Sequence, residues 1–118
     1  MKVLLDHCTP RRFGLRLIGH DVRHTSRVGM SKFANGALLA AASAGGFEVL
    51  LTVDTNLAKQ QAVGELPLAV IVVIVPRNTE AALSVHLPEI MALLGQRLQR
   101  RVYVVGKSEG KTEGTKQR

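Results

Sequence analysis

Three short, largely apolar runs constrain this chain more than any other feature of its sequence. They lie at Val3–Leu5, Phe47–Val53 and Leu68–Val75. Continuous runs rich in Val, Ile and Leu are typical of strands that are buried on both faces of a parallel sheet. Segments with helix signals stand between them, so strand and helix alternate along the chain. This alternation predicts an α/β fold with right-handed crossovers around a mainly parallel central sheet of four to five strands.

The segments between the runs carry helix and turn signals. Thr9 and Pro10 predict an N-cap followed by a first helical turn. Asn35 predicts the start of an Ala-rich helix, which Gly45-Gly46 would end by supplying a left-handed C-cap. Pro88 should bend or split a later helix. The remaining elements are predicted as helices over 11–18, 36–44, 56–63 and 79–99, a polar edge strand over 20–24 and a last strand over 102–105.

An aspartate follows the first two apolar runs directly. Asp6 closes the first run and Asp54 closes the second. Ligands of open parallel sheets bind outside the carboxyl ends of the strands, so both carboxylates would face one crevice if their strands are neighbours. Glu48 is excluded from that crevice because it lies near the opposite end of its strand from Asp54. The alternative interpretation is that Asp54 caps the following helix and that Asp6 caps the Thr9 turn.

Oxygen ligands of this kind suit a hard divalent ion. Magnesium and manganese are held by one or two carboxylates together with substrate phosphate. Strand alternation places Thr52 on the same side as Asp54, where it would orient the carboxylate or a metal-bound water. Asn56 and Asn35 would supply neutral oxygens, although each is equally explained as a turn or cap residue. The sequence therefore predicts a site for a divalent metal ion at this edge of the sheet.

The other polar candidates are interpreted as structural. His7 should point away from Asp6 if strand alternation continues, and the histidines show no metal-ligand spacing. Cys8 has no activating partner in the sequence and is interpreted as a small packed residue. A single cysteine forms no internal disulfide, which suits a reduced cytoplasmic compartment.

Length and charge limit the class of protein. The chain has 118 residues and a net charge of +7, so we expect one domain over 1–106 and a basic, disordered tail over 107–118. Its longest apolar run is far shorter than the roughly 20 residues of a membrane helix. The first 32 residues hold seven Lys or Arg against two Asp. This basic third predicts attraction of nucleic acid, with a merely solubilising surface as the alternative.

The sequence resembles the compact PIN-like nuclease family related to VapC-type toxins, over roughly residues 1–105. The resemblance implies a three-layer α/β/α fold, a ribonuclease activity that depends on magnesium or manganese, and a toxin–antitoxin setting. It rests on Val3-Leu4-Leu5-Asp6 with Pro10, Gly19-His20-Asp21-Val22, Asn35-Gly36 with Leu38-Leu39, and Gly46 to Asp54 with Asn56-Leu57.

This chain departs from the family at about half of its acidic positions. Asp6 and Asp54 match two of the three or four carboxylates. The acidic position on the helix falls at Asn35-Gly36-Ala37, and the position shortly after Asp54 is Asn56. Neutral amide oxygens bind a hard cation more weakly than carboxylates do, so the resemblance implies a weakly occupied site.

The leading hypothesis is a ribonuclease in which water attacks an RNA phosphodiester. Asp6 and Asp54 would hold the ion, and Arg11, Arg12 and Lys32 would contact backbone phosphates. The expected partners are RNA, an antitoxin protein and a second copy of the chain, the last through an Ala-rich face at 40–42 or an apolar stripe at 87–94 that is otherwise core. The alternative is a degenerate PIN-like module that binds RNA or a protein without cleavage. A phospho-acceptor receiver domain fits poorly, because it needs an acidic pair after the first strand.

Overall fold

The computed structural model describes residues 1–33, 35–56 and 66–106. The predicted helix over 56–63, except its first residue, and the tail over 107–118 lie outside the described residues. The elements in chain order are β1 (Lys2–Leu5), η1 (Arg11–Arg16), β2 (Asp21–His24), η2 (Thr25–Arg27), α1 (Asn35–Ala44), β3 (Val49–Thr52), β4 (Ala69–Val73), α3 (Glu80–Ser84), α4 (Leu87–Leu94) and β5 (Val102–Val105).

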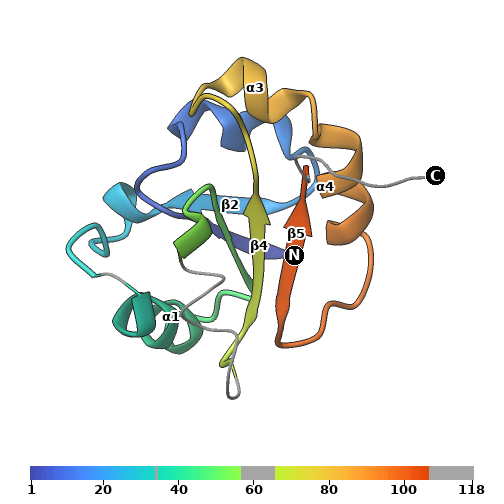
Figure 1. Cartoon of the computed structure of the whole chain (residues 1–118). Coiled ribbons are helices and arrows are strands. Elements are labelled where there is room, and N and C mark those ends of the chain that lie inside the picture. Colours follow the sequence, from blue (N-terminus) through green and yellow to red (C-terminus); the bar gives the residue numbers. More distant parts are fainter. Residues whose placement is uncertain (34, 57–65, 107–118) are drawn as a thin grey trace.

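Five strands form one sheet, and all of its pairings are parallel, which confirms the predicted α/β fold (Figure 1). The strand order is β2-β1-β3-β4-β5. The three apolar runs supply the central strands, because only these positions are covered on both faces. The polar segment at Asp21–His24 is an edge strand, as predicted.

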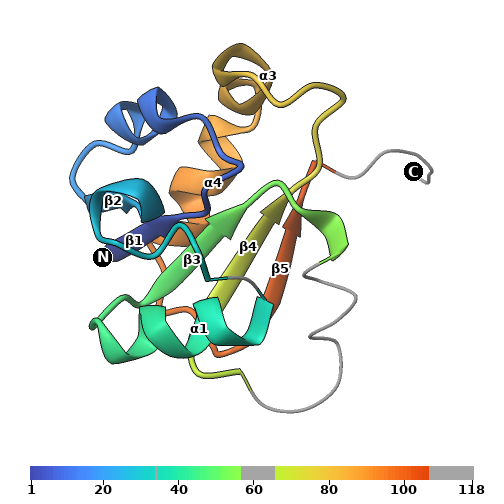
Figure 2. The same ribbon diagram turned by 90° about the vertical axis from the view of Figure 1, so that its left-hand side faces the viewer.

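Each face of the sheet packs against its own helical elements (Figure 2). Leu4 and Leu50 point to the face that α1 covers, where Leu38 and Leu39 are buried. Alternate strand residues point to the other face, which packs against η1, α3 and α4. Ala42 on α1, and Ile90 and Leu94 on α4, are fully or almost fully buried, so these apolar positions are core, as expected.

The segment after β1 differs from its prediction. Residues 11–16 form a 3₁₀ helix, with Phe13 N donating to Pro10 O and Leu17 N donating to Gly14 O. The predicted Thr9 cap is wrong: Pro10 occupies the cap position, and the buried Thr9 hydroxyl has no hydrogen-bond partner among the described residues. The tighter helix buries Phe13 against the sheet.

Helix ends follow their local signals closely. Gly46 has a φ of 85°, so it ends α1 in the predicted left-handed conformation. The long helix expected over 79–99 is split into α3 and α4, and Pro88 lies in the first turn of α4. Thr79 caps α3 by accepting from Ala82 N. None of the helices in the described ranges has the length and apolar character needed to cross a membrane.

Candidate functional site

Asp6 and Asp54 follow two strands that are hydrogen-bonded neighbours. β1 pairs with β3 in parallel, with Leu5 opposite Leu51. The chain leaves β1 for β2 on one side and returns through α1 to β3 on the other, so the topological switch point of the sheet lies between β1 and β3. Ligands of open parallel sheets bind at this point, beyond the strand ends. The sequence expectation that the two strands adjoin is therefore confirmed.

The carboxylate of Asp6 is buried and surrounded by donors. The residue is 4% exposed. His7 N donates to Oδ1 at 2.7 Å, and Thr52 Oγ1 donates to Oδ2 at 2.7 Å. The Cys8 thiol also donates to Oδ2, at 3.4 Å. A buried carboxylate needs such donors because desolvation otherwise makes its charge costly. Asp6 therefore takes part in the hydrogen bonding of the folded interior in addition to lying at the edge of the sheet.

Thr52 connects the two strand ends. Its hydroxyl is fully buried, donates to Asp6 and accepts from Asp54 N at 3.0 Å. One hydroxyl thereby joins the carboxylate after β1 to the backbone after β3. Thr52 thus bonds the carboxylate of Asp6 and the main chain of Asp54, whereas the sequence predicted a bond to the Asp54 carboxylate or to a metal-bound water.

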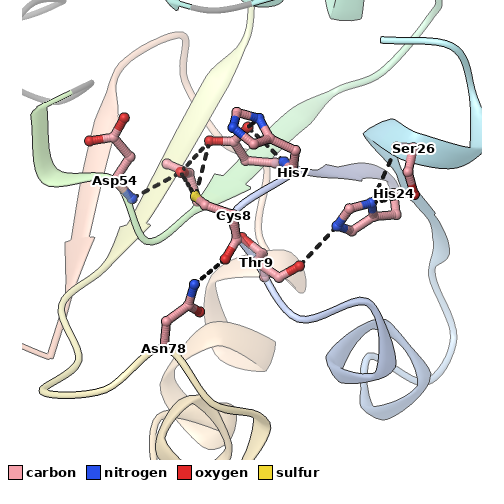
Figure 3. Close-up of polar contacts among 9 residues, drawn as sticks. His7, Cys8, Thr9, His24, Ser26, Asp54 and Asn78 are labelled. Carbon is pink, nitrogen blue, oxygen red and sulfur yellow. Dashed lines mark hydrogen bonds and ion pairs between the residues drawn. The ribbon is translucent and has the colours of Figure 1, made fainter. Parts of the chain in front are cut away.

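Asp54 directs its carboxylate differently. Its Oδ1 accepts from Asn56 N at 2.9 Å, which is the cap interaction that the sequence left open. Figure 3 shows this carboxylate pointing away from Cys8. The second oxygen accepts no hydrogen bond from any described donor. Among the described residues, one oxygen of Asp54 is therefore without a donor.

The position of His7 corrects a sequence prediction. Strand alternation predicts that His7 points away from Asp6, but its Nδ1 lies 3.0 Å from Asp6 Oδ1. Alternation does not apply, because β1 ends at Leu5 and a turn begins there. Cys8, beside it, is partly buried, and this burial is the main reason that the pKa of its thiol is raised. Cys8 is therefore a packed donor, in agreement with its interpretation from the sequence.

The remaining predicted residues are spread around this edge. Asn35 is the first residue of α1, and its side chain is outside the described set. Asn56 is exposed and meets Asp54 through its backbone N–H, not its side chain. Lys32 is exposed in the segment that leads to α1. Arg11 and Arg12 are exposed on η1.

The residues present fit a weakly held divalent ion better than a tightly held one. No three His, Cys, Asp or Glu side chains in the described ranges come together as a cation site. Asp6 and Asp54 supply the hard oxygens that magnesium and manganese prefer, and substrate phosphate normally completes such sites. An ion at Asp6 would compete with the donors from His7 and Cys8.

A hollow that we call the β1 cleft opens at the loop that follows Asp6, with His7 and Cys8 in its lining. Its volume is about 450 Å³. His24 is held in its wall, with Nε2 donating to Thr9 O at 2.9 Å and Nδ1 accepting from Ser26 N at 3.2 Å (Figure 3). Burial lowers the pKa of His24, so the neutral ring matches its partners. The lining residues are His7, Cys8, Thr9, Pro10, Arg11, His24, Ser26 and Asn78.

Sequence reasoning missed His24 and Asn78 as parts of this site. Asn78 Nδ2 donates to Cys8 O and so ties the loop after β4 to the loop after β1. His24 ends the edge strand and reaches back to the β1 loop. The only signal for either residue was its position at the end of a strand or in the loop that follows one. Parallel pairing brings the ends of these strands to the same edge of the sheet.

No family model matches this chain, and neither the curated proteins nor the solved structures contain a significant match to it. Its function is therefore inferred from the geometry at the ends of β1 and β3.

Proposed function

We propose that the protein is a PIN-like ribonuclease that hydrolyses RNA phosphodiesters with a weakly bound divalent ion. The observation that carries the proposal is the linkage of Asp6 through Thr52 to Asp54 at the switch point of the sheet. Arg11, in the wall of the β1 cleft, adds a cation for an RNA phosphate.

Asp6 and Asp54 would hold magnesium or manganese, with substrate phosphate completing the ligand set. The ion, when bound, polarises the phosphodiester and lowers the pKa of an attacking water. Thr52 would keep Asp6 oriented by its hydrogen bond. Arg11 and Arg12 would position the backbone.

The proposal extends to the setting that the resemblance implies. The protein would be the toxin of a toxin–antitoxin pair, acting in the cytoplasm, with an antitoxin protein as its partner. A short gene that overlaps the start of the coding sequence would support this setting. Growth arrest on expression, relieved by the neighbouring gene product, is the expected phenotype.

The test is cleavage of a labelled single-stranded RNA in manganese by the wild type and by Asp6→Asn and Asp54→Asn. Both substitutions should abolish cleavage while leaving the circular dichroism spectrum unchanged. Glu89→Gln is the matched control, because Glu89 is an exposed carboxylate on α4. Cleavage that persists in both aspartate variants, after removal of contaminating nucleases, would exclude the assignment.

One observation favours a second candidate, an RNA-binding module without cleavage. Both oxygens of Asp6 already accept from protein donors, so a metal has to displace part of the fold's own hydrogen bonding. Calorimetric titration with manganese separates the two functions. Heat of binding that requires Asp6 supports the nuclease, whereas no binding even with an oligonucleotide present supports the binding module.

A further inference from the structure

Four arginines converge on a second hollow, which we call the arginine groove. Arg11 and Arg12 come from η1, Arg23 from β2 and Arg27 from η2. The volume of the groove is about 340 Å³. Its other lining residues are Leu15, Val22 and His24. Two segments of the chain, η1 and the contiguous stretch of β2 and η2, thus place guanidinium groups around one concave surface.

The charges of the groove are poorly compensated. Arg23 pairs with Asp21 at 2.9 Å, but both side chains are more than half exposed, and such pairs are weak. Arg11, Arg12 and Arg27 form no ion pair in the described part of the chain. Like charges brought together around a hollow create a positive potential that attracts an anion.

Two arginines outside the groove show what a partnered guanidinium looks like in this fold. Arg16 is on the same 3₁₀ helix as Arg11, yet its Nε donates to Glu80 at 2.7 Å. Arg101 stacks over the ring of Tyr103, with its guanidinium carbon 3.9 Å from the ring centroid. Arg11, Arg12 and Arg27 have no such partner among the described residues, and all three line the same hollow.

The arginine groove adjoins the β1 cleft. Both hollows are lined by Arg11 and His24. In the view of Figure 3, His24 and Asp54 lie on opposite sides of Cys8. An extended ligand in the groove would continue toward the two aspartates.

We propose that the arginine groove binds backbone phosphates of a single strand of nucleic acid whose next nucleotides lie in the β1 cleft. Guanidinium groups donate bidentate hydrogen bonds to phosphate oxygens. Leu15, which is 78% exposed, offers an apolar surface to a sugar or base. Hollows of about 340 and 450 Å³ accommodate parts of one strand rather than a double helix.

The groove should bind with little sequence preference and strong salt dependence. No described Phe, Tyr or Trp lines it, so it lacks the stacking platform that many single-strand binders use. Affinity then comes mainly from phosphate neutralisation and release of counterions. The direction of the strand toward Asp6 rests on the proposed function, whereas phosphate binding in the groove requires neither metal nor cleavage.

The test is fluorescence anisotropy with a labelled 12-nucleotide RNA in EDTA at several salt concentrations. The double variant Arg12→Ala/Arg27→Ala should bind at least tenfold more weakly. The slope of log affinity against log salt should fall by about 1.4, because each phosphate neutralised on a single strand accounts for roughly 0.7. Both side chains are exposed, and thermal melting would confirm that the variant is folded.

Arg97→Ala/Arg100→Ala is the control of equal charge. These exposed arginines lie between α4 and β5, and β5 is the edge of the sheet opposite to β2. The control should keep wild-type affinity and slope. Equal weakening of the two double variants would overturn the groove and leave only a general effect of net charge.

Further arms of the experiment separate the ligand classes and the two proposals. DNA of the same length should bind within a few-fold of RNA, and a polyglutamate of equal charge should bind far more weakly. Polyglutamate binding equal to that of RNA would overturn the assignment to nucleic acid. Glu89→Gln, at an exposed position of α4, should bind like the wild type. RNA that is bound in the groove but never cut would refute the nuclease alone, whereas binding insensitive to Arg12 and Arg27 would refute the groove alone.

Discussion

The loops after β1 and β3 both present an aspartate, and they treat it in opposite ways. Asp6 is buried, and both its oxygens accept hydrogen bonds from neighbouring residues. Asp54 is partly exposed and accepts the backbone N–H of Asn56. The same residue type is thus part of the folded interior at one strand end and a helix cap at the other. The difference shows that a carboxylate at a strand end can have its oxygens already engaged by protein donors, as in Asp6.

The hydroxyl of Thr52 makes the two loops one unit. It donates to Asp6 and accepts from the backbone of Asp54. A change at either loop is therefore transmitted through one buried atom. Substitutions at the two loops should therefore show how much each aspartate contributes to the free energy of unfolding, separately from its role in the proposed cleavage of RNA.

The largest expected effect on stability is that of Asp6→Ala. It should lower the free energy of unfolding by about 3 kcal/mol, because the buried donors of Thr52 and His7 lose a charged acceptor. Asp54→Ala should lower it by about 1 kcal/mol, the usual value for a lost cap. Urea unfolding of the two variants measures the difference, and equal losses would contradict the contrast between the two loops.

The next effect tests the link itself. Thr52→Val keeps the shape of the side chain but removes its hydroxyl, which leaves Asp54 N without a partner and Asp6 Oδ2 with the Cys8 thiol alone. We expect a loss of about 2 kcal/mol in the free energy of unfolding. Thr52→Ser restores the hydroxyl and should recover most of the loss. Failure of Ser to improve on Val would show that packing, not the hydrogen bonds, decides the effect.

A smaller effect should appear on acidification, and it should involve the β1 loop. Burial lowers the pKa of His24, with the Arg11 and His7 charges acting in the same direction and Asp6 and the Thr9 carbonyl opposing them. The unfolded state then takes up the proton first as pH falls. Stability should therefore decrease progressively below the ordinary histidine pKa of about 6.5.

His24→Gln removes this titration and provides the comparison. The difference in urea midpoint between pH 8 and pH 5.5 should be smaller in His24→Gln than in the wild type. An unchanged difference would show that the acid sensitivity arises elsewhere. Reduced protection of the Thr9 and His24 amides from hydrogen exchange at pH 5.5 would show that the loss of stability occurs where His24 contacts the β1 loop.

The smallest effect concerns the reactivity of Cys8. Burial and the Asp6 charge raise the pKa of the thiol, while hydrogen bonds from Thr52 and Val53 oppose them. Only the thiolate reacts with iodoacetamide, so modification at pH 8 should be slower than that of a free cysteine peptide. Asp6→Asn should accelerate it. A wild-type rate equal to that of the peptide would contradict the described packing of Cys8.

The sheet was predictable because its signals are local. Continuous apolar runs indicated the three central strands, and the polar segment ending at His24 indicated an edge strand. Gly46 and Pro88 marked where helices end or divide. Each of these signals acts through nearby backbone geometry or through burial on both faces, which a single sequence records directly.

The detailed site was less predictable because its contacts join distant segments. Asn78 meets Cys8 across 70 residues, and Thr52 meets Asp6 across 46. His7 was misplaced because the strand ends one residue earlier than its alternation suggested. The Thr9 cap was wrong because a 3₁₀ helix starts after Pro10. Turn geometry and contacts between distant segments determine where these side chains lie, and a local sequence pattern indicates neither of them.

Paramagnetic broadening by manganese tests the central claim most directly. Amide resonances of the protein would be recorded with a non-cleavable single-stranded RNA, before and after addition of substoichiometric Mn²⁺. We predict selective broadening of the residues that follow β1 and β3, Asp6 to Cys8 and Val53 to Asn56, and its loss in Asp6→Asn. Broadening centred elsewhere, or none at these residues, would contradict a metal-assisted site at the two strand ends.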